Sequence, residues 1–594
     1  MNNLEEGAAP QATPGQVPPP TAESASLRSG DGVWDRIKRH KVVEWSLAYI
    51  AFGYALLHGS QMLRETLEWS EAVPRFTLFA LLLGFPIAAT LAWYHGHRAE
   101  HRVSRTEIAI LVGLLLIAGS GLWWLARAGS GDRALVIQSL PSATPLGANS
   151  IAVLPFADLS EKKDEGYFSD GISEELIELL SHVPQLQVIA PASSFYFKGK
   201  QVTDADVARA LGVAHILEGS VRKAGSRMRV TAHLVRADGG LDIWSQTFDR
   251  DLTDIFKMQD EIASSVVGSL KIRLLSAQLS DPYRSDDPAA YDQFLRGREF
   301  LRRENLEGGR SAIEAFRKAT VLDSHYAVAY AALSIAESYV ADYGSDAAGM
   351  KRALEAAQTA IALAPNLALA YRARAYVRME ALDFSGQRAD LLKAISLAPD
   401  DGKILSDYGW MLGEFGRLQE ATAALEKAAV LDPMSSDPWY NLGTLLVMNH
   451  DSAGARRAYQ RCFAIAPERD VAYVDLGTLD LIEGRLNSAL ADYQATRDAA
   501  IGQMGIALVE HARHHDALSQ EALQGLIDRY ATTYAYQIAE VFAWRGETNR
   551  ALDWLERALR QQDNGLSRVR TDPLMNSVQS EPRFHALLER LGLS

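Results

Sequence analysis

Residues 407–433, DYGWMLGEFGRLQEATAALEKAAVLDP, identify the architecture of the carboxy-terminal half of this chain. The proline that closes this segment belongs to an evenly spaced series of prolines. Their spacing matches the period of about 34 residues that is typical of a unit of two helices joined by a turn, and so regular a series does not arise by chance. The sequence therefore predicts a helical repeat array with units ending at Pro365, Pro399, Pro433 and Pro467.

The composition of these units resembles that of tetratricopeptide repeats (TPRs). In the quoted unit, Gly409, Ala421 and Leu425 stand where TPR helices pack closely, and Gly416 stands in the turn. Small residues let the two helices of a unit approach, while large residues fill the gap in the neighbouring unit. The next two units repeat the pattern with Trp439, Leu442, Gly443, Ala455 and Tyr459, and with Tyr473, Leu476, Gly477, Gly484, Ala489 and Tyr493.

About eight such units are expected between residues 286 and 594. The second unit is longer than the others, because the interval from Ser324 to Pro365 exceeds the repeat period. Degenerate helices in 505–530 are expected to form one further unit. The last helix, over 581–591, is expected to cap the array.

The TPR resemblance implies a right-handed superhelix whose concave face, lined by the first helix of each unit, is the usual ligand groove. Tyr376 and Trp410 occupy equivalent positions, so they are expected to form an aromatic strip suited to peptide capture. The alternative is that they pack against neighbouring helices. The Lys and Asn pattern with which some TPR domains clamp a terminal carboxylate is not reproduced here. The residues expected to line the groove are Arg372, Tyr376, Trp410, Tyr440 and Thr444.

Residues 150–278 predict a small α+β domain ahead of the array. Between Arg227 and Leu234 apolar and polar residues alternate, which is typical of a half-buried strand. Turn residues on both sides make it the middle of an antiparallel meander from Ile216 to Phe248. The other expected elements are strands at Ile151–Phe156 and Leu186–Ala190, a helix opening at Ser173, a short helix Asp204–Leu211 and a helix from Thr253.

Four runs in this region resemble the amino-terminal TolB-like domain that is found fused to TPR arrays. The resemblance implies a sensory or assembly module. In relatives this domain accompanies a nucleotide cyclase domain or a winged-helix DNA-binding domain, and this sequence has neither. The runs are SIAVLPF (150–156), YFSDGISEEL (167–176), LEGSVR (217–222) and IWSQTFDR (243–250).

Two clusters in this domain admit both a functional and a structural interpretation. Asp170, Glu174 and Glu175 suit a paired-carboxylate catalytic site, but acids at a helix amino terminus are the favoured explanation, because exposed N–H groups attract them. The run FYFK at 195–198, with Lys200, suits a stacking platform for single-stranded nucleic acid. The favoured interpretation is that the aromatic residues belong to the buried core and are followed by basic residues where the chain leaves it, since the chain is acidic overall.

Residues 1–149 predict a membrane anchor. Residues 1–35 are rich in proline and small polar residues and are expected to be disordered. About 20 predominantly apolar residues suffice for a helix to cross a bilayer, and residues 36–127 hold three such stretches. Glycines and prolines in 128–149 predict a linker. The three stretches are Val42–Leu63, Phe76–Tyr94 and Ile108–Leu125.

Basic residues in the short connections predict how this anchor is oriented, because cytoplasmic flanks are enriched in Lys and Arg. Four basic residues lie in 36–41 and three arginines lie in 98–105, so both segments are expected in the cytoplasm. Three crossings then place everything after Ala126 on the opposite side of the inner membrane, which is the periplasm in a Gram-negative cell. If one span fails to insert, this part is cytoplasmic.

Composition and motifs disfavour several classes of function. A formal net charge of −14 argues against general nucleic-acid binding, and a single cysteine, Cys462, excludes an intrachain disulfide. Neither a nucleotide-binding glycine loop nor a nucleophile elbow is found in the sequence. No catalytic, cofactor or metal site is therefore expected. Two histidine groups are disfavoured as metal ligands, namely His95, His97 and His101, and the pair His511 and His515.

Taken together, the sequence predicts a multidomain protein with transmembrane helices, then a small α+β domain, then an all-α TPR solenoid. The expected function is that of a membrane-anchored scaffold or sensor, not an enzyme, which binds protein or peptide partners on the periplasmic side. The alternative is a cytoplasm-facing regulatory subunit of a separate signalling enzyme such as a nucleotide cyclase.

Overall fold

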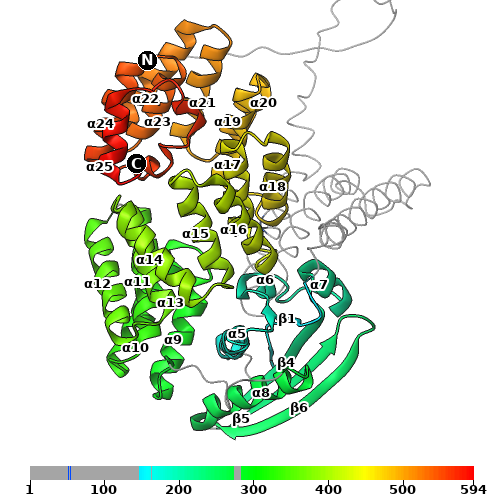
Figure 1. Ribbon diagram of the computed structural model, residues 1–594. Coiled ribbons are helices and arrows are strands. Elements are labelled where there is room, and N and C mark those ends of the chain that lie inside the picture. Colours follow the sequence, from blue (N-terminus) through cyan, green and yellow to red (C-terminus); the bar gives the residue numbers. More distant parts are fainter. Residues whose placement is uncertain are drawn as a thin grey trace, which may run out of the picture. The chain divides into compact units, whose positions relative to one another are not determined.

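The computed structural model describes Ala51, Tyr54 and residues 146–161, 164–225, 227–272, 283–344 and 346–594 (Figure 1). The chain divides into two compact units, Met1–Leu135 and Val136–Ser594. The predicted tail, most of the linker and, apart from Ala51 and Tyr54, the three predicted spans lie outside the described residues. Within the described part of the chain, no helix is long and apolar enough to cross a membrane.

A mixed sheet organises the first part of the second unit. Its strands run in the order β3-β1-β4-β5-β6, with β2 paired to β4. Strand β1 pairs in parallel with β3 and β4, whereas β4, β5 and β6 form the expected antiparallel meander. The elements are β1 (Ser150–Val153), β2 (Ala157–Asp158), α5 (Gly166–Ser181), β3 (Gln187–Val188), α6 (Pro191–Phe195), α7 (Asp204–Leu211), β4 (His215–Ala224), β5 (Arg227–Arg236), β6 (Leu241–Asp251), η1 (Leu252–Asp254) and α8 (Ile255–Ser269).

Helices pack on both faces of this sheet around β1. Because successive side chains of a strand point to opposite faces, Ile151 and Val153 share a hydrophobic cluster with α5 and α8. Ala152 belongs to a separate cluster with Phe197 and with Val207 of α7. The sheet is thus a central layer with a core on each side.

Helix α5 begins earlier than the sequence indicated. It starts at Gly166, so Asp170, Glu174 and Glu175 lie in its interior, and its first turn contains no acidic residue. The three carboxylates are buried. The expectation that they sit at a helix amino terminus is therefore wrong.

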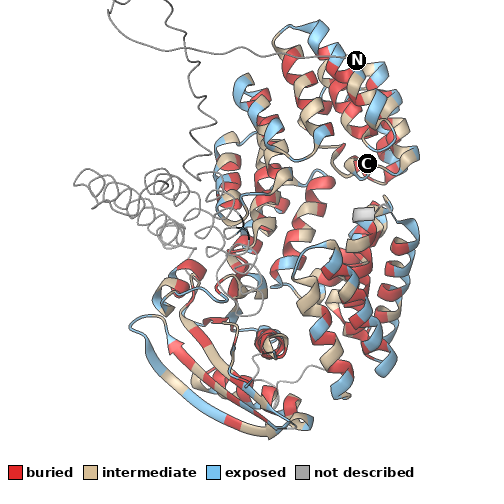
Figure 2. Ribbon diagram, turned by 180° about the vertical axis from the view of Figure 1, so that it is seen from behind, coloured by how far each residue is buried: buried red, intermediate tan, exposed pale blue. Residues whose placement is uncertain are grey.

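The rest of the second unit is a solenoid of paired helices, which confirms the TPR-like architecture. Buried residues lie on the facing sides of the helices (Figure 2). Within residues 288–561, apart from Ser345, the pairs are α9 (Pro288–Leu301) with α10 (Leu306–Leu322), α11 (Ala327–Gly344) with α12 (Ala347–Leu363), α13 (Ala368–Glu380) with α14 (Phe384–Leu397), α15 (Gly402–Glu414) with α16 (Leu418–Leu431), α17 (Ser436–Met448) with α18 (Ser452–Ile465), α19 (Asp470–Ile482) with α20 (Leu486–Ala495), α21 (Ala499–Ala512) with α22 (Asp516–Tyr530), and α23 (Ala535–Trp544) with α24 (Thr548–Gln561).

Close helix approach explains the glycines of the repeats. A Cβ at Gly443 would lie 2.6 Å from Cε1 of Tyr459, and one at Gly505 would lie 2.3 Å from Cβ of Tyr493. Any larger residue would push apart the two helices of a unit at Gly443, and two neighbouring units at Gly505. The sequence pattern of small against large residues is therefore a packing pattern.

The turns inside the units repeat one backbone conformation. Leu382, Gly416, His450 and Gly484 stand one repeat period apart and have φ values of 57°, 71°, 60° and 75°. A left-handed residue after a helix satisfies the last carbonyl groups and ends the helix. The left-handed turn thus recurs at the repeat period even in the units where Leu382 or His450 stands in place of glycine.

The extra residues of the second unit lengthen its helices. Helices α11 and α12 contain 18 and 17 residues, against 13 and 14 in α13 and α14. The insertion is therefore absorbed in helical structure rather than in a loop.

The chain after α24 does more than cap the last unit. It contains η2 (Asn564–Arg568), η3 (Pro573–Met575) and α25 (Pro582–Leu591). Leu566 and Val569 are fully buried in a cluster that also contains Phe384 of α14. Helix α13 contacts η2, and Arg570 donates to the carbonyl oxygen of Leu593. Residues 563–578, called the return segment below, therefore tie the end of the array to its middle.

Candidate partner-binding face of the array

The first helices of several successive units lie side by side. Helix α11 contacts α13, α15 contacts α17, and α17 contacts α19. Of the five residues expected to line this face, the structure leaves one well exposed, holds two in partial exposure and buries two.

Tyr376 is exposed and lies among carboxylates. Its side chain is 38% exposed, and burial of the remainder raises its pKa, with further increases from the negative charges of Glu380, Asp342 and Asp407. Burial raises the pKa of Glu380 to about 7, and Asp342 adds to this shift, while a hydrogen bond from Asn564 opposes it. These four residues from α11, α13 and α15 are called the Tyr376 patch.

Arg372 neutralises one member of this patch. Its Nε donates to Oδ2 of Asp407 at 2.7 Å. Burial nevertheless raises the pKa of Asp407, although the guanidinium of Arg372 lowers it. Glu380 and Asp342 form no such ion pair within the described residues.

Trp410 packs in the next unit and does not project freely. Its ring stacks on Tyr440, with the ring centroids 6.4 Å apart and the planes 22° apart. Its Nε1 donates to Oε1 of Glu414 at 2.9 Å. Burial raises the pKa of Glu414 to about 8, opposed by hydrogen bonds from Gln387 and Trp410.

Tyr440 and Thr444 are buried, with 9% and 2% of their surfaces exposed. Thr444 donates to Oδ2 of Asp475 at 2.7 Å, and Nη2 of Arg568 donates to the other oxygen of that carboxylate at 2.6 Å. A cavity of about 10 Å³ lies between Trp410 and the return segment, and Arg568 is among the residues that line it. This part of the expected groove is therefore filled by the chain itself.

The occupying segment gave no repeat signal in the sequence. Arg568 lies among turn residues that follow no helical period, and its partner Asp475 is 93 residues away. Apolar residues three apart, Leu566 and Val569, both fully buried, are the local sign that this segment packs.

The buried carboxylates of α5 form ion pairs with the first array helix. Asp170 accepts from Lys198 at 2.5 Å and from Arg302 at 2.6 Å, and Glu174 lies 2.5 Å from Arg298. Glu175 lies 3.6 Å from the same guanidinium. All three carboxylates thus face cations, so the run 167–176 forms a domain junction and not an open carboxylate pair.

The aromatic run after β3 is also structural. Phe197 is buried, Lys200 lies over the ring of Tyr196, and Arg302 lies over the ring of Phe195. These contacts leave no row of free ring faces for nucleic-acid bases. The core interpretation thus holds for Phe197, whereas Phe195 and Tyr196 are half-buried and lie under cations.

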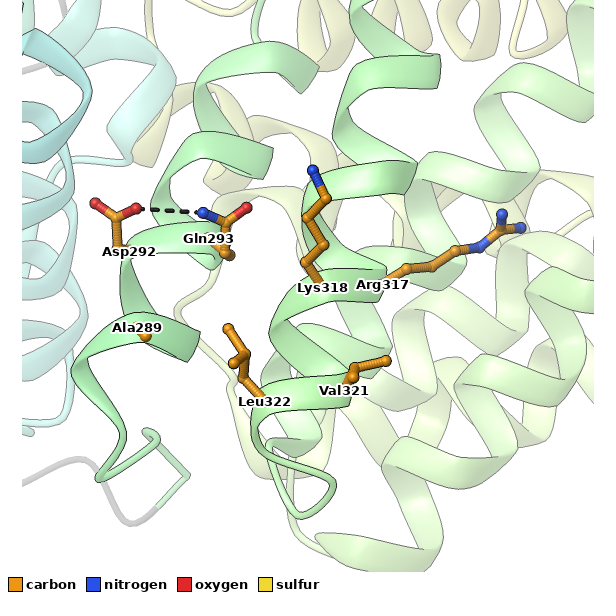
Figure 3. Close-up of a pocket in the computed structure, with 7 residues that line it drawn as sticks. All are labelled: Ala289, Asp292, Gln293, Arg317, Lys318, Val321 and Leu322. Atoms are coloured by element: carbon orange, nitrogen blue, oxygen red, sulfur yellow. Dashed lines mark hydrogen bonds between the residues drawn. The ribbon is translucent and has the colours of Figure 1, made fainter.

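A surface hollow of about 680 Å³ lies between α9 and α10 (Figure 3). Val321 and Leu322 contribute exposed apolar surface, and Asp292 is already hydrogen-bonded to Tyr167 at 2.7 Å. The side chains of Arg317 and Val321 point away from those of α9 (Figure 3). The hollow therefore lacks the convergent polar groups of a catalytic or cofactor pocket.

The histidines of the pair in α21 and the following turn contact acids. Nδ1 of His515 lies 2.7 Å from Glu510, and Nδ1 of His511 lies 3.4 Å from Asp516. Within the described ranges, no group of three His, Cys, Asp or Glu side chains is arranged to hold a metal ion. His95, His97 and His101 lie outside those ranges.

Comparisons with known sequences match parts of the chain. No protein-family profile matches it. It is 39% identical over 188 residues to "Putative adenylate cyclase 3" of Rhizobium meliloti (strain 1021), which is 31% of this chain and 32% of that protein. It is 32% identical over 98 residues to Protein O-mannosyl-transferase TMTC1 of Mus musculus, which is 16% of this chain and 10% of that protein. The chain thus spans about a third or less of these curated relatives.

Among solved structures, a tetratricopeptide repeat protein from Parabacteroides merdae ATCC 43184 overlaps with a TM-score of 0.33 at 14% identity, covering 43% of this chain and 98% of that one. PilW, a type IV pilus biogenesis factor, overlaps with a TM-score of 0.31 at 19% identity, covering 36% of this chain and 96% of that one. The description of the array as a TPR-like solenoid rests on the chain's own paired helices and regular repeat period.

Proposed function

We propose that this chain is a membrane-anchored scaffold, not an enzyme, whose array binds a protein or peptide partner. The Tyr376 patch carries the proposal, because an exposed aromatic ring on a first helix is surrounded by carboxylates. Aromatic side chains offer a large contact area at low entropic cost, and acids attract cationic partners. The ligand that fits is a segment with Lys or Arg beside an apolar residue.

Recovery of the partner from native membranes tests this site. The double variant Tyr376→Ala, Glu380→Gln should reduce recovery about tenfold, equivalent to about 1.4 kcal/mol. Leu392→Ala is the matched control, since Leu392 is 43% exposed on α14, the second helix of the same unit. Equal recovery with the double variant and the control would remove the patch from the proposal.

The proposed location is the periplasmic side of the inner membrane, and it rests on the three apolar stretches and the basic connections of residues 36–127. Reporter fusions after Ser594 test it. Active alkaline phosphatase with inactive β-galactosidase is expected, and the reverse pattern would place the array in the cytoplasm.

A second candidate function is regulation of a separate nucleotide cyclase from the cytoplasmic side. It is favoured by the similarity to the Rhizobium protein over 188 residues. In that case the purified chain should make no cyclic nucleotide from ATP, but should change the rate of a cyclase added separately. Cyclic nucleotide made by the chain alone would contradict both candidate functions.

A further inference from the structure

The α+β domain joins the array at two separate places, and the first of these is part of its core. Tyr291 and Phe294 of α9 belong to the same hydrophobic cluster as Leu176 of α5. A Cβ on Gly171 would lie 2.4 Å from Cδ2 of Leu295, so α5 and α9 are in direct contact. This junction cannot part without exposing the core of the domain.

The second place of contact is small and polar, between α6 and the turn joining α16 to α17. Oγ of Ser193 donates to Oδ1 of Asp432 at 2.5 Å and accepts the N–H of Met434 at 2.8 Å. The N–H of Ser193 donates to the same carboxylate oxygen at 3.1 Å, and that of Ala190 donates to the carbonyl of Leu431 at 3.0 Å. We call this set of contacts the latch.

One apolar side chain completes the latch. Met434 is 3% exposed and packs in the cluster that contains Ile189 and Leu211. A net hydrogen bond stabilises by about 1 kcal/mol, and burial of one methionine side chain by about 1.5–3 kcal/mol. The latch buries one apolar side chain whereas the core junction at α9 buries several, so the latch is the contact that opens first.

The charges around Asp432 come from both neighbouring first helices. Burial raises its pKa to about 6, Lys403 of α15 and the hydrogen bonds of Ser193 lower it, and Asp437 of α17 raises it further. Asp437 is itself paired with Arg469 at 2.7 Å. The carboxylate is thus held without a direct cationic partner, which leaves Ser193 as its main support.

We propose that the latch opens while the α9 junction stays closed, and that the closed latch sets the curvature of the array between α9 and α16. The curvature of a solenoid is the sum of small rotations between successive units. The α+β domain is fixed to the first unit through α9, and the latch fixes it to the turn after the fourth unit. The two contacts together hold the summed rotation between these units at one value. Opening the latch removes one of two ties on the units between, so that they rotate within the range that the return segment leaves to α13 and α14, and so adapt to a bound partner.

Amide hydrogen exchange of the full-length chain tests whether the latch opens separately. Ser193→Ala should speed exchange at Ala190 and Met434 about tenfold or more, with no change in α9. Ser194→Ala is the matched control, because Ser194 is fully buried in the same helix and its hydroxyl has no hydrogen-bond partner within the described residues. If both variants behave alike, or if α6 exchanges only together with α9, the latch is not a separate opening unit.

Distances between spin labels test the effect on curvature. Labels on exposed Glu307 of α10 and Glu426 of α16, in a Cys462→Ala background, report the span that the latch holds. One narrow distance distribution is expected for the otherwise unchanged chain and for Ser194→Ala, with a broader one for Ser193→Ala. An unchanged distribution in Ser193→Ala would overturn the curvature claim.

Discussion

The buried carboxylate of Glu414 on a first helix predicts that the stability of the array depends on pH. Glu414 is 3% exposed, and burial raises its pKa to about 8, whereas the unfolded value is about 4.3. Because the folded value is raised, the protonated carboxyl stabilises the fold at low pH. That stabilisation is lost as pH rises from about 4 through 8.

Replacing Glu414 by glutamine should remove this dependence. The glutamine amide oxygen still accepts the hydrogen bond from Trp410, but the amide cannot ionise. At pH 8.5 the Glu414→Gln variant should therefore melt about 2–4 °C higher than the unchanged chain, which corresponds to a gain of roughly 1 kcal/mol in the free energy of unfolding. At pH 5 the two should differ little. Glu426→Gln, on the exposed face of α16, is the control and should show no such difference between the two pH values.

The helices of the array could be predicted from sequence, whereas the start of α5 could not. Prolines, glycines and small residues at fixed spacing indicate the helices of the repeats. In the structure these residues lie in the turns and at the close contacts between helices. Helix α5 has no side-chain cap at its first residue. Ser173 followed by two acids looks like a helix start, but tertiary ion pairs with α9 explain those acids.

Contact between α5 and α9 depends on one glycine. Gly171→Ala should destabilise the α+β domain by about 1–3 kcal/mol, because its Cβ would overlap Leu295. Gly166→Ala in the same helix is the control, since nothing lies within 4 Å of the added atom. The free energy of unfolding of both variants is measured by denaturation monitored by circular dichroism. Similar losses from the two changes would contradict the packing described for α5.

The latch should respond to pH through Asp432. Its pKa is raised to about 6 in the closed state, so protonation favours closure, and this contribution is lost as pH rises from about 4 to 6. Spin-label distances should therefore broaden between pH 4.5 and 7. Asp432→Asn should abolish this change with pH. If the distance distribution of Asp432→Asn still broadens as the pH rises, another titrating group causes the change.

Over the whole array, the repeat frame indicated the positions of the groove residues but not what covers them. Trp410 and Thr444 stand at equivalent positions, yet the return segment lies beside Trp410, and its Arg568 pairs with the same carboxylate, Asp475, to which Thr444 donates. Contacts between residues as far apart as Asn564 and Glu380 leave no trace in the repeat period. The return segment reaches α13 at Glu380, yet Tyr376 one turn away stays 38% exposed.

Closure of the array by the return segment should depend on Arg568. Arg568→Met leaves the carboxylate of Asp475, which is 3% exposed, without its cation. The free energy of unfolding should fall by about 2–4 kcal/mol, somewhat less than for a fully buried pair, because Arg568 is partly exposed. Adding Asp475→Asn should recover part of this loss. Arg550→Met is the control, since Arg550 forms an exposed pair with Glu547 that is worth about 1 kcal/mol or less. Equal effects of the two arginine changes would contradict the closed groove.

Photo-crosslinking in living cells asks whether the open end of this face meets another protein. A benzophenone amino acid in place of Tyr376, compared with one in place of Leu392, reports contacts on the two sides of the same unit. A crosslink to another polypeptide from position 376 and not from 392 is the expected result. Crosslinks from 376 that join only this chain to itself, or equal crosslinking at both positions, would contradict a partner-binding function for the Tyr376 patch.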